Sequence, residues 1–296
     1  MPRCSVIIPS YNGAATIRMC LESIVPQAQA ADAEIIVIDS STDGTYEIVK
    51  SEFPTVRLFH FPTRMYPDEA RTFAIAQTSA DIIAFTDADC TVNPEWLNEK
   101  IRLHDEGHEI VFGAIRCHPQ CNLIGWGYYF VEFSFFLRYL APGYVKSTSN
   151  CNLSLKRSLF SLVQYRQEKL MSLDAQLIRD FHTRGKRPYY DPSHTVYHYY
   201  IGSLARMLQH FFHLAYDCVL IDYQFGTVRK GRRIFYLIGW PLLPMLKIAF
   251  VFPVLIKSKR EYLGKFFLCL PYTLAGSAAW VSGACWAHLA MIWRGK

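Results

Sequence analysis

The first 90 residues alternate between two patterns of apolar positions. Four short apolar runs, "CSVII", "EIIVI", "TVRLFHF" and "DIIAF", predict strands that end near residues 8, 38, 61 and 85. Each of the first three is followed by a segment with apolar residues at helical spacing, such as Ile17, Leu21 and Ile24. The predicted order is therefore β-α-β-α-β-α-β. Strands that are apolar on both faces belong in a parallel sheet covered by helices, which indicates an α/β fold.

A further helix and strand are predicted at "NPEWLNEKIRLHDEG" and "EIVFGAIRC". The aromatic stretch that follows, residues 123–140, has nearly the length of a membrane span but contains Glu132 and Arg138. These two charges favour a helix that packs against protein or lies at a membrane interface.

The chain becomes more apolar after residue 229. Residues 234–256 are long enough to span a bilayer, yet they contain three prolines and the central Lys247, so a span, a re-entrant segment and an interfacial helix all remain open. Residues 262–293 are the better transmembrane candidate, because small residues along them suit helix packing in lipid. Basic residues lie on both sides of residues 234–256. Because basic residues favour the cytosolic side of a membrane, we expect both clusters to lie on that side. The alternative is a pair of buried helices in a soluble protein.

Composition and charge narrow the function classes. The 296 residues carry a net charge of +6, which suits anionic ligands or membranes, but no helix-turn-helix, zinc-finger or RNA-binding pattern accompanies it, so we expect no nucleic-acid partner. Nine cysteines, an odd number, are scattered over core-like and membrane-like segments. They indicate reduced thiols in a domain that faces the cytosol. The N-terminus lacks the apolar run of a signal peptide, so we expect this part to stay in the cytosol.

Three polar loops follow predicted strands and would meet at one edge of the sheet. Their sequences are "PSYNG", "DSSTDGT" and "TDADC", and the last contains Asp87 and Asp89. Carboxylates combined with ligand phosphates are the environment that Mg²⁺ or Mn²⁺ prefers. Taken alone, two aspartates flanking an alanine are more typical of a solvated turn. The glycine fingerprints of dinucleotide folds and P-loops are absent, so neither NAD nor ATP hydrolysis is indicated.

Several ordered motifs resemble the family 2 glycosyltransferases of the GT-A fold. They are "SVIIPSYNGAATIRMCLESI", "IIVIDSSTDGT", "ARTFAIAQTSADIIAFTDADC", "SNCNLSLKR" and "LDAQLIRDFHTRGKRPYYDPSHTVYH", and together they cover about residues 4–200. The resemblance implies a Rossmann-like, mostly parallel sheet flanked by helices. It also implies transfer of a sugar from a nucleotide sugar with inversion, assisted by Mg²⁺ or Mn²⁺. On this basis we divide the chain into a nucleotide-sugar-binding half (1–116), an acceptor-binding half (117–228) and membrane-associated helices (229–296).

The resemblance implies roles for five residues of the donor site. Pro9 and Tyr11 would line the pocket for the nucleotide base, and Asp39 would hold the base. The loop after Asp39 is one residue shorter than is usual in the family, so Asp43 is an alternative to Asp39. Arg71 would contact the donor, or would form an ordinary salt bridge on a helix surface.

The resemblance also implies a metal site and a catalytic base. Asp87 and Asp89 match the metal motif of the family, with Asp89 as the direct ligand. His198 matches a histidine that can complete the metal shell, and its alternative is a core histidine among aromatic residues. Asp174 matches the base that deprotonates the acceptor, although Leu173 replaces the acid that usually precedes it. Asp174 would also suit the N-cap of a helix.

These patterns lead to one main function and two alternatives. The main interpretation is a membrane-associated glycosyltransferase that uses a UDP- or GDP-sugar and a lipid-linked glycan acceptor in polysaccharide or glycoconjugate synthesis. Its catalytic domain would face the cytosol at the cytoplasmic membrane. The first alternative is a polyprenyl-phosphate glycosyltransferase, which would need no base because its acceptor is already an anion. The second is a non-catalytic, membrane-anchored GT-A-like binding subunit.

Overall fold

A computed structural model describes the chain except residues 163–172, 201, 229, 240–241 and 295–296, and it leaves the side chains of 173–176 and 230–234 undescribed. The described residues form two compact units. The first unit contains residues 1–118, 141–162 and 173–199, and the second contains residues 119–140 and the chain from 200 onwards. The predicted division at residues 116 and 228 refers to donor and acceptor roles and stays a prediction.

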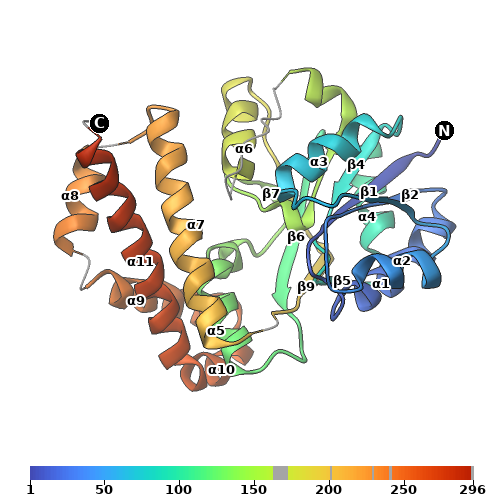
Figure 1. Ribbon diagram of the computed structural model, residues 1–296. Helices are drawn as coiled ribbons and strands as arrows, with labels where there is room; N and C mark the ends of the chain where they lie inside the picture. The colour runs from blue at the N-terminus through green and yellow to red at the C-terminus, as the bar shows by residue number, and fades with distance from the viewer. Residues whose placement is uncertain (163–172, 201, 229, 240–241, 295–296) are drawn as a thin grey trace. The chain divides into compact units, whose positions relative to one another are not determined.

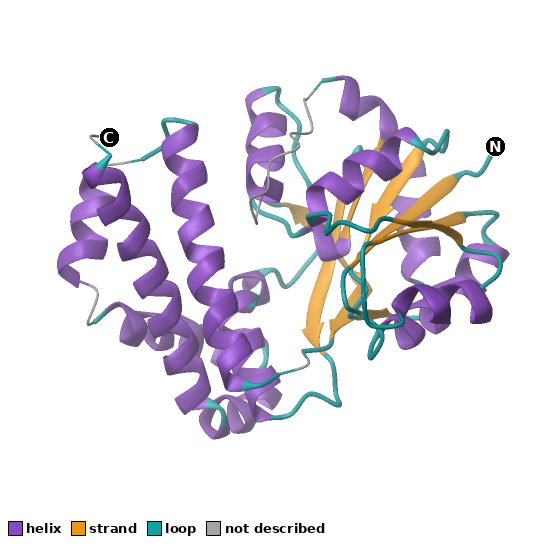
Figure 2. Ribbon diagram, in the orientation of Figure 1, coloured by secondary structure: helices purple, strands orange, loops and turns teal. Residues whose placement is uncertain are grey.

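The first unit is built on a nine-stranded mixed sheet with the order β3-β2-β1-β4-β8-β6-β9-β5, and β7 pairs with β9 (Figures 1 and 2). Strands β1 to β4 are parallel, whereas β8 is antiparallel to β4 and to β6. Strand β9 runs parallel to β6 and antiparallel to β5. The strands are β1 (Cys4–Ser10), β2 (Glu34–Asp39), β3 (Arg57–His60), β4 (Ile82–Phe85), β5 (Cys90–Val92), β6 (Ile110–Cys117), β7 (Gly143–Tyr144), β8 (Leu153–Lys156) and β9 (Tyr189–His198).

Burial on both faces explains why the first strands read as apolar runs. Every residue of β4 is buried, and β1 and β2 each have one residue that is not. The predicted β-α-β-α-β-α-β order is confirmed. The helices of this unit are α1 (Ile17–Ala30), α2 (Thr45–Glu52), α3 (Pro67–Ala76), α4 (Trp96–Asp105) and α6 (Leu173–Thr183), and its 3₁₀ turns are η2 (Asn150–Asn152) and η3 (Arg157–Ser161).

Two features of the core lie close to β6, β8 and β9, namely a tight backbone approach at Gly113 and the hydrogen bonds of Asn152. The register of β6 with β9 shifts after Gly113, where an added Cβ would lie 2.2 Å from the backbone oxygen of His194, so only glycine fits there. Close by, Asn152 accepts a 2.8 Å hydrogen bond from the indole of Trp96. The backbone oxygen of Asn152 accepts a 3.1 Å bond from Nζ of Lys100, whose side chain is fully buried.

All regular elements among the described residues of the second unit are helices. Its longest helices, α7 and α11, approach each other closely at Gly283, where an added Cβ would lie 2.1 Å from the backbone oxygen of Phe212. The aromatic stretch predicted from sequence forms a ten-residue helix followed by a 3₁₀ turn. The elements are α5 (Leu123–Glu132), η1 (Ser134–Arg138), α7 (Leu204–Gln224), α8 (Lys230–Gly239), α9 (Leu243–Ser258), η4 (Arg260–Tyr262), α10 (Leu263–Leu268) and α11 (Leu270–Trp293).

Within the described residues, no single helix combines the length and the apolar character of a membrane span. One pair of segments, Arg260–Leu268 and Leu270–Trp293, meets those criteria when taken together, with a bend of 78° between them. The predicted segment 262–293 is therefore broken at residue 269. The predicted segment 234–256 corresponds to parts of α8 and α9, with residues 240–241 outside the described part.

Candidate donor and metal site

The turn after β4 (Ile82–Phe85) carries Asp87 and Asp89, the two aspartates of the predicted metal motif. The backbone N–H of Thr86 still donates to Ile7 of β1, and the N–H of Cys90 then donates to the oxygen of Asp87 at 3.1 Å, which closes the turn before β5. Asp87 and Asp89 are both partly buried at this edge, with side chains 29% and 40% exposed. The turn thus presents two carboxylates at the end of a buried strand, as the sequence predicted.

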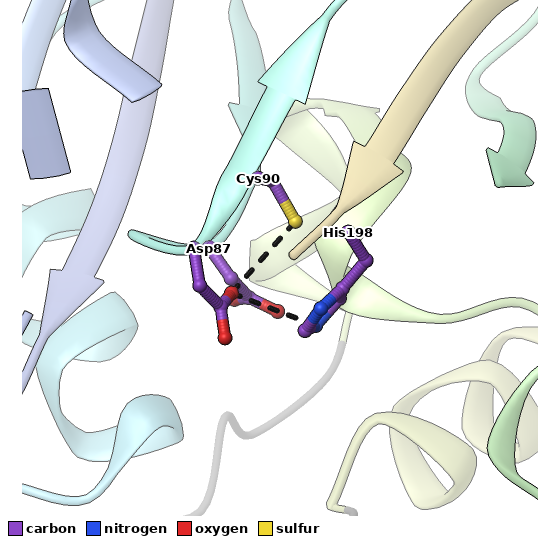
Figure 3. A group of neighbouring side chains, drawn as sticks. Asp87, Cys90 and His198 are labelled. Atoms are coloured by element: carbon purple, nitrogen blue, oxygen red, sulfur yellow. Dashed lines mark hydrogen bonds and ion pairs between the residues drawn. The ribbon is translucent and has the colours of Figure 1, made fainter. Parts of the chain in front are cut away.

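Strand β9 brings His198 to this turn. Its pairing with β5 sets His198 opposite Cys90, and the N–H of the next residue, Tyr199, donates to the backbone oxygen of Asp89 at 2.7 Å. Nε2 of His198 lies 3.5 Å from Oδ1 of Asp89. One potential ligand atom from each of Asp87, Asp89, Cys90 and His198 lies within 4.8 Å of the others. Figure 3 shows Asp87, Cys90 and His198 gathered around this point. The imidazole therefore faces a carboxylate rather than only aromatic neighbours.

The chemistry of this group fits a hard divalent cation. Two carboxylates and an imidazole are suitable ligands for Mn²⁺, and the carboxylates alone suit Mg²⁺. Cys90 differs because its side chain is fully buried, and this burial, together with the neighbouring Cys151 and Asp89, raises the pKa of the thiol well above its ordinary value. A protonated thiol is a poor metal ligand. Asp87, Asp89 and His198 are therefore the candidate ligands in this group, and their role in metal binding stays a prediction.

Arg71 is buried and contacts the metal turn directly. Its guanidinium donates to Oδ1 of Asp87 at 2.7 Å and to Oδ1 of Asp68 at 3.0 Å, and only 5% of the residue is exposed. Asn150 donates to the same oxygen of Asp68 at 3.3 Å. Arg71 is therefore not part of an ordinary surface salt bridge, since it holds Asp87 beside Asp89. Its predicted contact with the donor stays a prediction.

The base-pocket candidates lie at the ends of β1 and β2. Pro9 is in β1 and Tyr11 follows the strand, with 44% of Tyr11 exposed. The guanidinium of Arg64 lies 4.3 Å from the centroid of the Tyr11 ring. Asp39 is completely buried at the end of β2, where its Oδ2 lies 2.7 Å from Nδ1 of His60. A loop from β3 and the loop after β1 thus approach each other at this edge.

The side chain of Asp43, in the loop after β2, forms a hydrogen bond with the loop after β1. Its carboxylate accepts hydrogen bonds from the hydroxyl of Thr45 at 2.5 Å and from the backbone N–H of Ala14 at 3.1 Å. Partial burial raises the pKa of this carboxyl, but the bonds from Thr45 and Ala14 outweigh that effect and lower it overall. In the same loops Asn12 accepts from the backbone N–H of Thr42 at 3.0 Å. These contacts give Asp43 a structural role, and the choice between Asp39 and Asp43 as the residue that holds the base stays a prediction.

The remaining site prediction, Asp174, lies in the first turn of α6, and its side chain is outside the described residues. Its role as base stays a prediction. Sequence reasoning missed His60 and Asp68 as partners of Asp39 and Arg71. His60 had a readable signal, because it is the last polar residue of a predicted strand whose carboxyl end belongs at the same sheet edge.

Comparison with known proteins identifies the family to which the sequence is similar. The sequence model of glycosyl transferase family 2 matches residues 5–163, more than half of the chain. The glycosyltransferase AglE of Haloferax volcanii is 31% identical over 121 residues, which are 39% of this chain and 40% of AglE. A GalNAc(5)-diNAcBac-PP-undecaprenol beta-1,3-glucosyltransferase of Campylobacter jejuni is 29% identical over 128 residues, 42% of this chain and 41% of that enzyme. The matched region thus spans less than half of each of these relatives.

Solved structures share the fold. The mannosyltransferase PcManGT of Pyrobaculum calidifontis, whose structure contains GDP-Man and Mn²⁺, aligns with a TM-score of 0.63 at 20% identity and covers 97% of this chain and 87% of its own. TarS 1-349 of S. aureus, in complex with UDP-GlcNAc, aligns with a TM-score of 0.55 at 16% identity, covering 100% of this chain and 93% of its own. These likenesses establish a GT-A-like α/β fold.

Proposed function

Because the chain belongs to glycosyl transferase family 2, we propose that it transfers a sugar from a UDP- or GDP-sugar to a hydroxyl of a lipid-linked glycan, with inversion and with Mg²⁺ or Mn²⁺. The observation that carries the proposal is the group formed by Asp87, Asp89 and His198 at the carboxyl edge of the sheet. Structural neighbours with Mn²⁺ and nucleotide sugars, and one relative named for an undecaprenol-linked acceptor, support it.

In this proposal different residues have different roles in the reaction. Asp89 and His198 would hold the cation, and Arg71 would keep Asp87 in position through its 2.7 Å contact. A divalent cation bound there would neutralise the negative charge that develops on the leaving nucleoside diphosphate. On the acceptor side, Asp174 would take the proton of the attacking hydroxyl, because an alcohol must lose its proton as it bonds to the anomeric carbon.

The metal assignment is tested by substituting Asp89. We expect Asp89→Asn to lower Mn²⁺-dependent turnover or hydrolysis of the nucleotide sugar at least 100-fold, since a direct carboxylate ligand is lost. Asp81→Asn is the matched control. Asp81 lies at the opposite end of β4, where it pairs with Lys156 at 2.8 Å, and its loss should leave turnover within about twofold. Unchanged turnover in Asp89→Asn would refute the metal assignment.

The acceptor class is tested by substituting Asp174. A hydroxyl acceptor needs a base, so Asp174→Asn should lower kcat by about 100-fold or more. A polyprenyl-phosphate acceptor is already ionised, and with it the same substitution would change kcat by less than about threefold. Asp180→Asn, in the same helix α6, controls for the loss of a carboxylate from that helix. A silent Asp174→Asn therefore favours the polyprenyl-phosphate alternative.

The exposed apolar side chains of the second unit support the membrane part of the proposal. Among the described residues, the large apolar side chains that are more than half exposed are mostly in this unit, whereas the first unit has Met1 and Tyr144. Exposed basic residues accompany them, and such a mixture suits the headgroup region of an anionic membrane. The apolar residues are Leu140, Phe235, Ile238, Leu242, Met245, Leu246, Phe267, Leu268, Trp286 and Trp293, and the basic ones are Lys257, Arg260, Lys265 and Arg294.

Membrane attachment is tested with lipid vesicles. The purified chain should sediment with phosphatidylglycerol-containing vesicles, and replacing Phe267 and Leu268 by serine should lower the bound fraction at least tenfold, since burial of each side chain contributes about 2 kcal/mol. Tyr144→Ser, at an equally exposed position of the first unit, should have no effect. Equal binding of the double variant and the parent would count against this surface. A position at the cytoplasmic membrane with the catalytic unit facing the cytosol completes the proposal.

A further inference from the structure

The thiol of Cys90 lies among the candidate ligands of the metal turn. Its Sγ is 3.9 Å from Oδ1 of Asp89, and the same oxygen is 3.5 Å from Nε2 of His198 (Figure 3). Cys90 and His198 are directly opposite each other in the antiparallel pairing of β5 with β9, so both side chains extend from the same face of the sheet. One sulfur, one nitrogen and one oxygen are therefore within reach of a single cation.

The separations in this group are close to those of a tetrahedral ion with mixed ligands. Zn²⁺ binds sulfur at about 2.3 Å and nitrogen or oxygen at about 2.0–2.1 Å, so in a tetrahedron a sulfur and an oxygen are about 3.5 Å apart and a nitrogen and an oxygen about 3.3 Å apart. The corresponding distances here are 3.9 Å and 3.5 Å. Small rotations of the side chains of Cys90 and Asp89 would remove this difference.

Further thiols surround the same turn. Sγ of Cys20, from α1, donates to the backbone oxygen of Asp87 at 3.5 Å, and the thiols of Cys90 and Cys151 are hydrogen-bond partners. Cys20, Cys90 and Cys151 carry free thiols, and each is at most 1% exposed. Thiolate sulfur selects soft cations such as Zn²⁺, whereas carboxylate oxygen suits Mg²⁺ and Mn²⁺. One side of the metal turn thus has ligand atoms of a kind that a hard cation does not use.

A thiophilic cation would change the state of the Cys90 thiol. When Asp89 and His198 hold such an ion, two positive charges lie beside the sulfur, and a thiol that coordinates a divalent cation is deprotonated outright. The S–H proton passes to solvent as the sulfur–metal bond forms. The fourth position of the tetrahedron remains for water or for a ligand oxygen.

We propose that Cys90, His198 and Asp89 form a thiophilic cation site that takes Zn²⁺ or Cd²⁺. The site shares His198 and Asp89 with the proposed site for Mg²⁺ or Mn²⁺, so the two ions exclude each other. A thiophilic ion would therefore displace the cation that assists sugar transfer and inhibit the enzyme. The inhibition rests on the proposed function, whereas the binding of the ion to Cys90 does not.

Titration of the whole protein with Cd²⁺ tests the site, because a cadmium–thiolate bond gives an ultraviolet charge-transfer band. The parent should show this band, and Cys90→Ala should remove it and lower the affinity for Cd²⁺ at least tenfold. Cys90→Ser, which keeps a polar group of similar size, should do the same. Cys4→Ala is the matched control, because the Cys4 thiol is also completely buried but lies within β1, and it should leave the band unchanged.

Two more variants separate the ligands from their neighbours. Cys151→Ala should retain the band, because Cys90 is the thiol that lies with the other ligand atoms among the described residues. His198→Gln should lower the affinity for Cd²⁺ at least tenfold and still show the band at saturation, since the thiolate remains. Loss of the band in Cys151→Ala, with Cys90→Ala unchanged, would overturn the assignment.

Competition with Mn²⁺ tests whether the two sites share ligands. Mn²⁺ that is bound, as shown by calorimetry, should weaken the binding of Cd²⁺ to the parent at least tenfold. In the transferase assay Zn²⁺ should inhibit turnover with Mn²⁺, and Cys90→Ser should raise the Zn²⁺ concentration for half-inhibition at least tenfold. A band that bound Mn²⁺ does not weaken would place the thiophilic ion elsewhere and overturn the inference.

The outcomes distinguish the inference from the proposed function. If Cys90→Ala and Cys90→Ser both keep the band and the affinity of the parent, the inference is overturned, whatever reaction the chain catalyses. If the band depends on Cys90 but no nucleotide sugar is turned over with Mg²⁺ or Mn²⁺, the proposed function fails and the thiophilic site stands.

Discussion

The buried amine of Lys100 has a cost in stability that can be measured. The side chain lies wholly inside the first unit, with Nζ 5.0 Å from the Trp96 ring and bonded to the backbone oxygen of Asn152. Desolvation lowers its pKa from 10.5 to about 7, although the nearby thiols of Cys4 and Cys151 act in the opposite direction. The unfolded chain therefore binds one more proton than the folded chain between these pH values.

This difference gives both a sign and a magnitude. Because the unfolded state binds more protons, the free energy of unfolding rises with pH between about 7 and 10.5, by about 1.4 kcal/mol per pH unit. At pH 7.5 the penalty is then about 4 kcal/mol, and at pH 9.5 it is about 1.4 kcal/mol. Lys100→Met removes this penalty but leaves the oxygen of Asn152 without its donor, which costs about 2 kcal/mol. The variant should be more stable by about 2 kcal/mol at pH 7.5 and slightly less stable at pH 9.5.

Thiol labelling in urea reports on this unit alone. Cys4 is completely buried in β1, so after equilibration in urea a short pulse of thiol reagent labels it only in molecules whose first unit is unfolded. Mass spectrometry of the peptide that contains Cys4 gives the unfolding curve at each pH. The same change at exposed Lys50 of α2 controls for replacing lysine by methionine. A stability difference between Lys100→Met and the parent that does not change from pH 7.5 to 9.5 would refute the reasoning.

Three further changes test other parts of the structure. Gly113→Ala should lower the free energy of unfolding by more than about 3 kcal/mol, since its Cβ would lie 2.2 Å from the oxygen of His194; a stable, soluble variant by the same labelling assay would contradict the bulge. Asp43→Ala should be less stable than the parent at pH 7, and the difference should narrow as the pH falls through the lowered pKa of Asp43, because the stability that comes from this shift is lost when the carboxylate is protonated; urea curves showing a constant gap would argue otherwise. Cys90→Ser should change Mn²⁺ affinity by less than about threefold in titration calorimetry, and a larger loss would make the thiol a ligand.

Local pattern was sufficient to predict the part of the fold that holds the donor loops. Parallel strands buried on both faces are nearly continuous apolar runs, so β1, β2 and β4 and the polar loops after them could be identified from sequence. The position of Asp87 and Asp89 at the end of a buried strand followed from the same reasoning. The resemblance to a family added His198, whose approach to Asp89 no local pattern indicates.

Features that depend on pairing between distant strands could not be predicted in this way. The contact of His60 with Asp39 arises from the register of β2 and β3, and the burial of Arg71 arises from Asp68 and the turn after β4. The length of the apolar segments also suggested that the C-terminal helices were longer and more continuous than they are. The predicted segment 262–293 bends by 78° near residue 269, because hydropathy measures composition and not the path of the backbone.

The place of β9 between β6 and the edge strand β5 sets an order of events during biosynthesis. Asp87 and Asp89 leave the ribosome more than 100 residues before His198, and β9 must insert between β6 and β5 before the imidazole reaches the carboxylates. At translation rates of about 5–20 residues per second, the nascent chain exposes an incomplete cation site for several seconds or longer. With the proposed ligands, full affinity for the cation would appear only when β9 has joined the sheet, so that metal uptake would report the completion of the first unit.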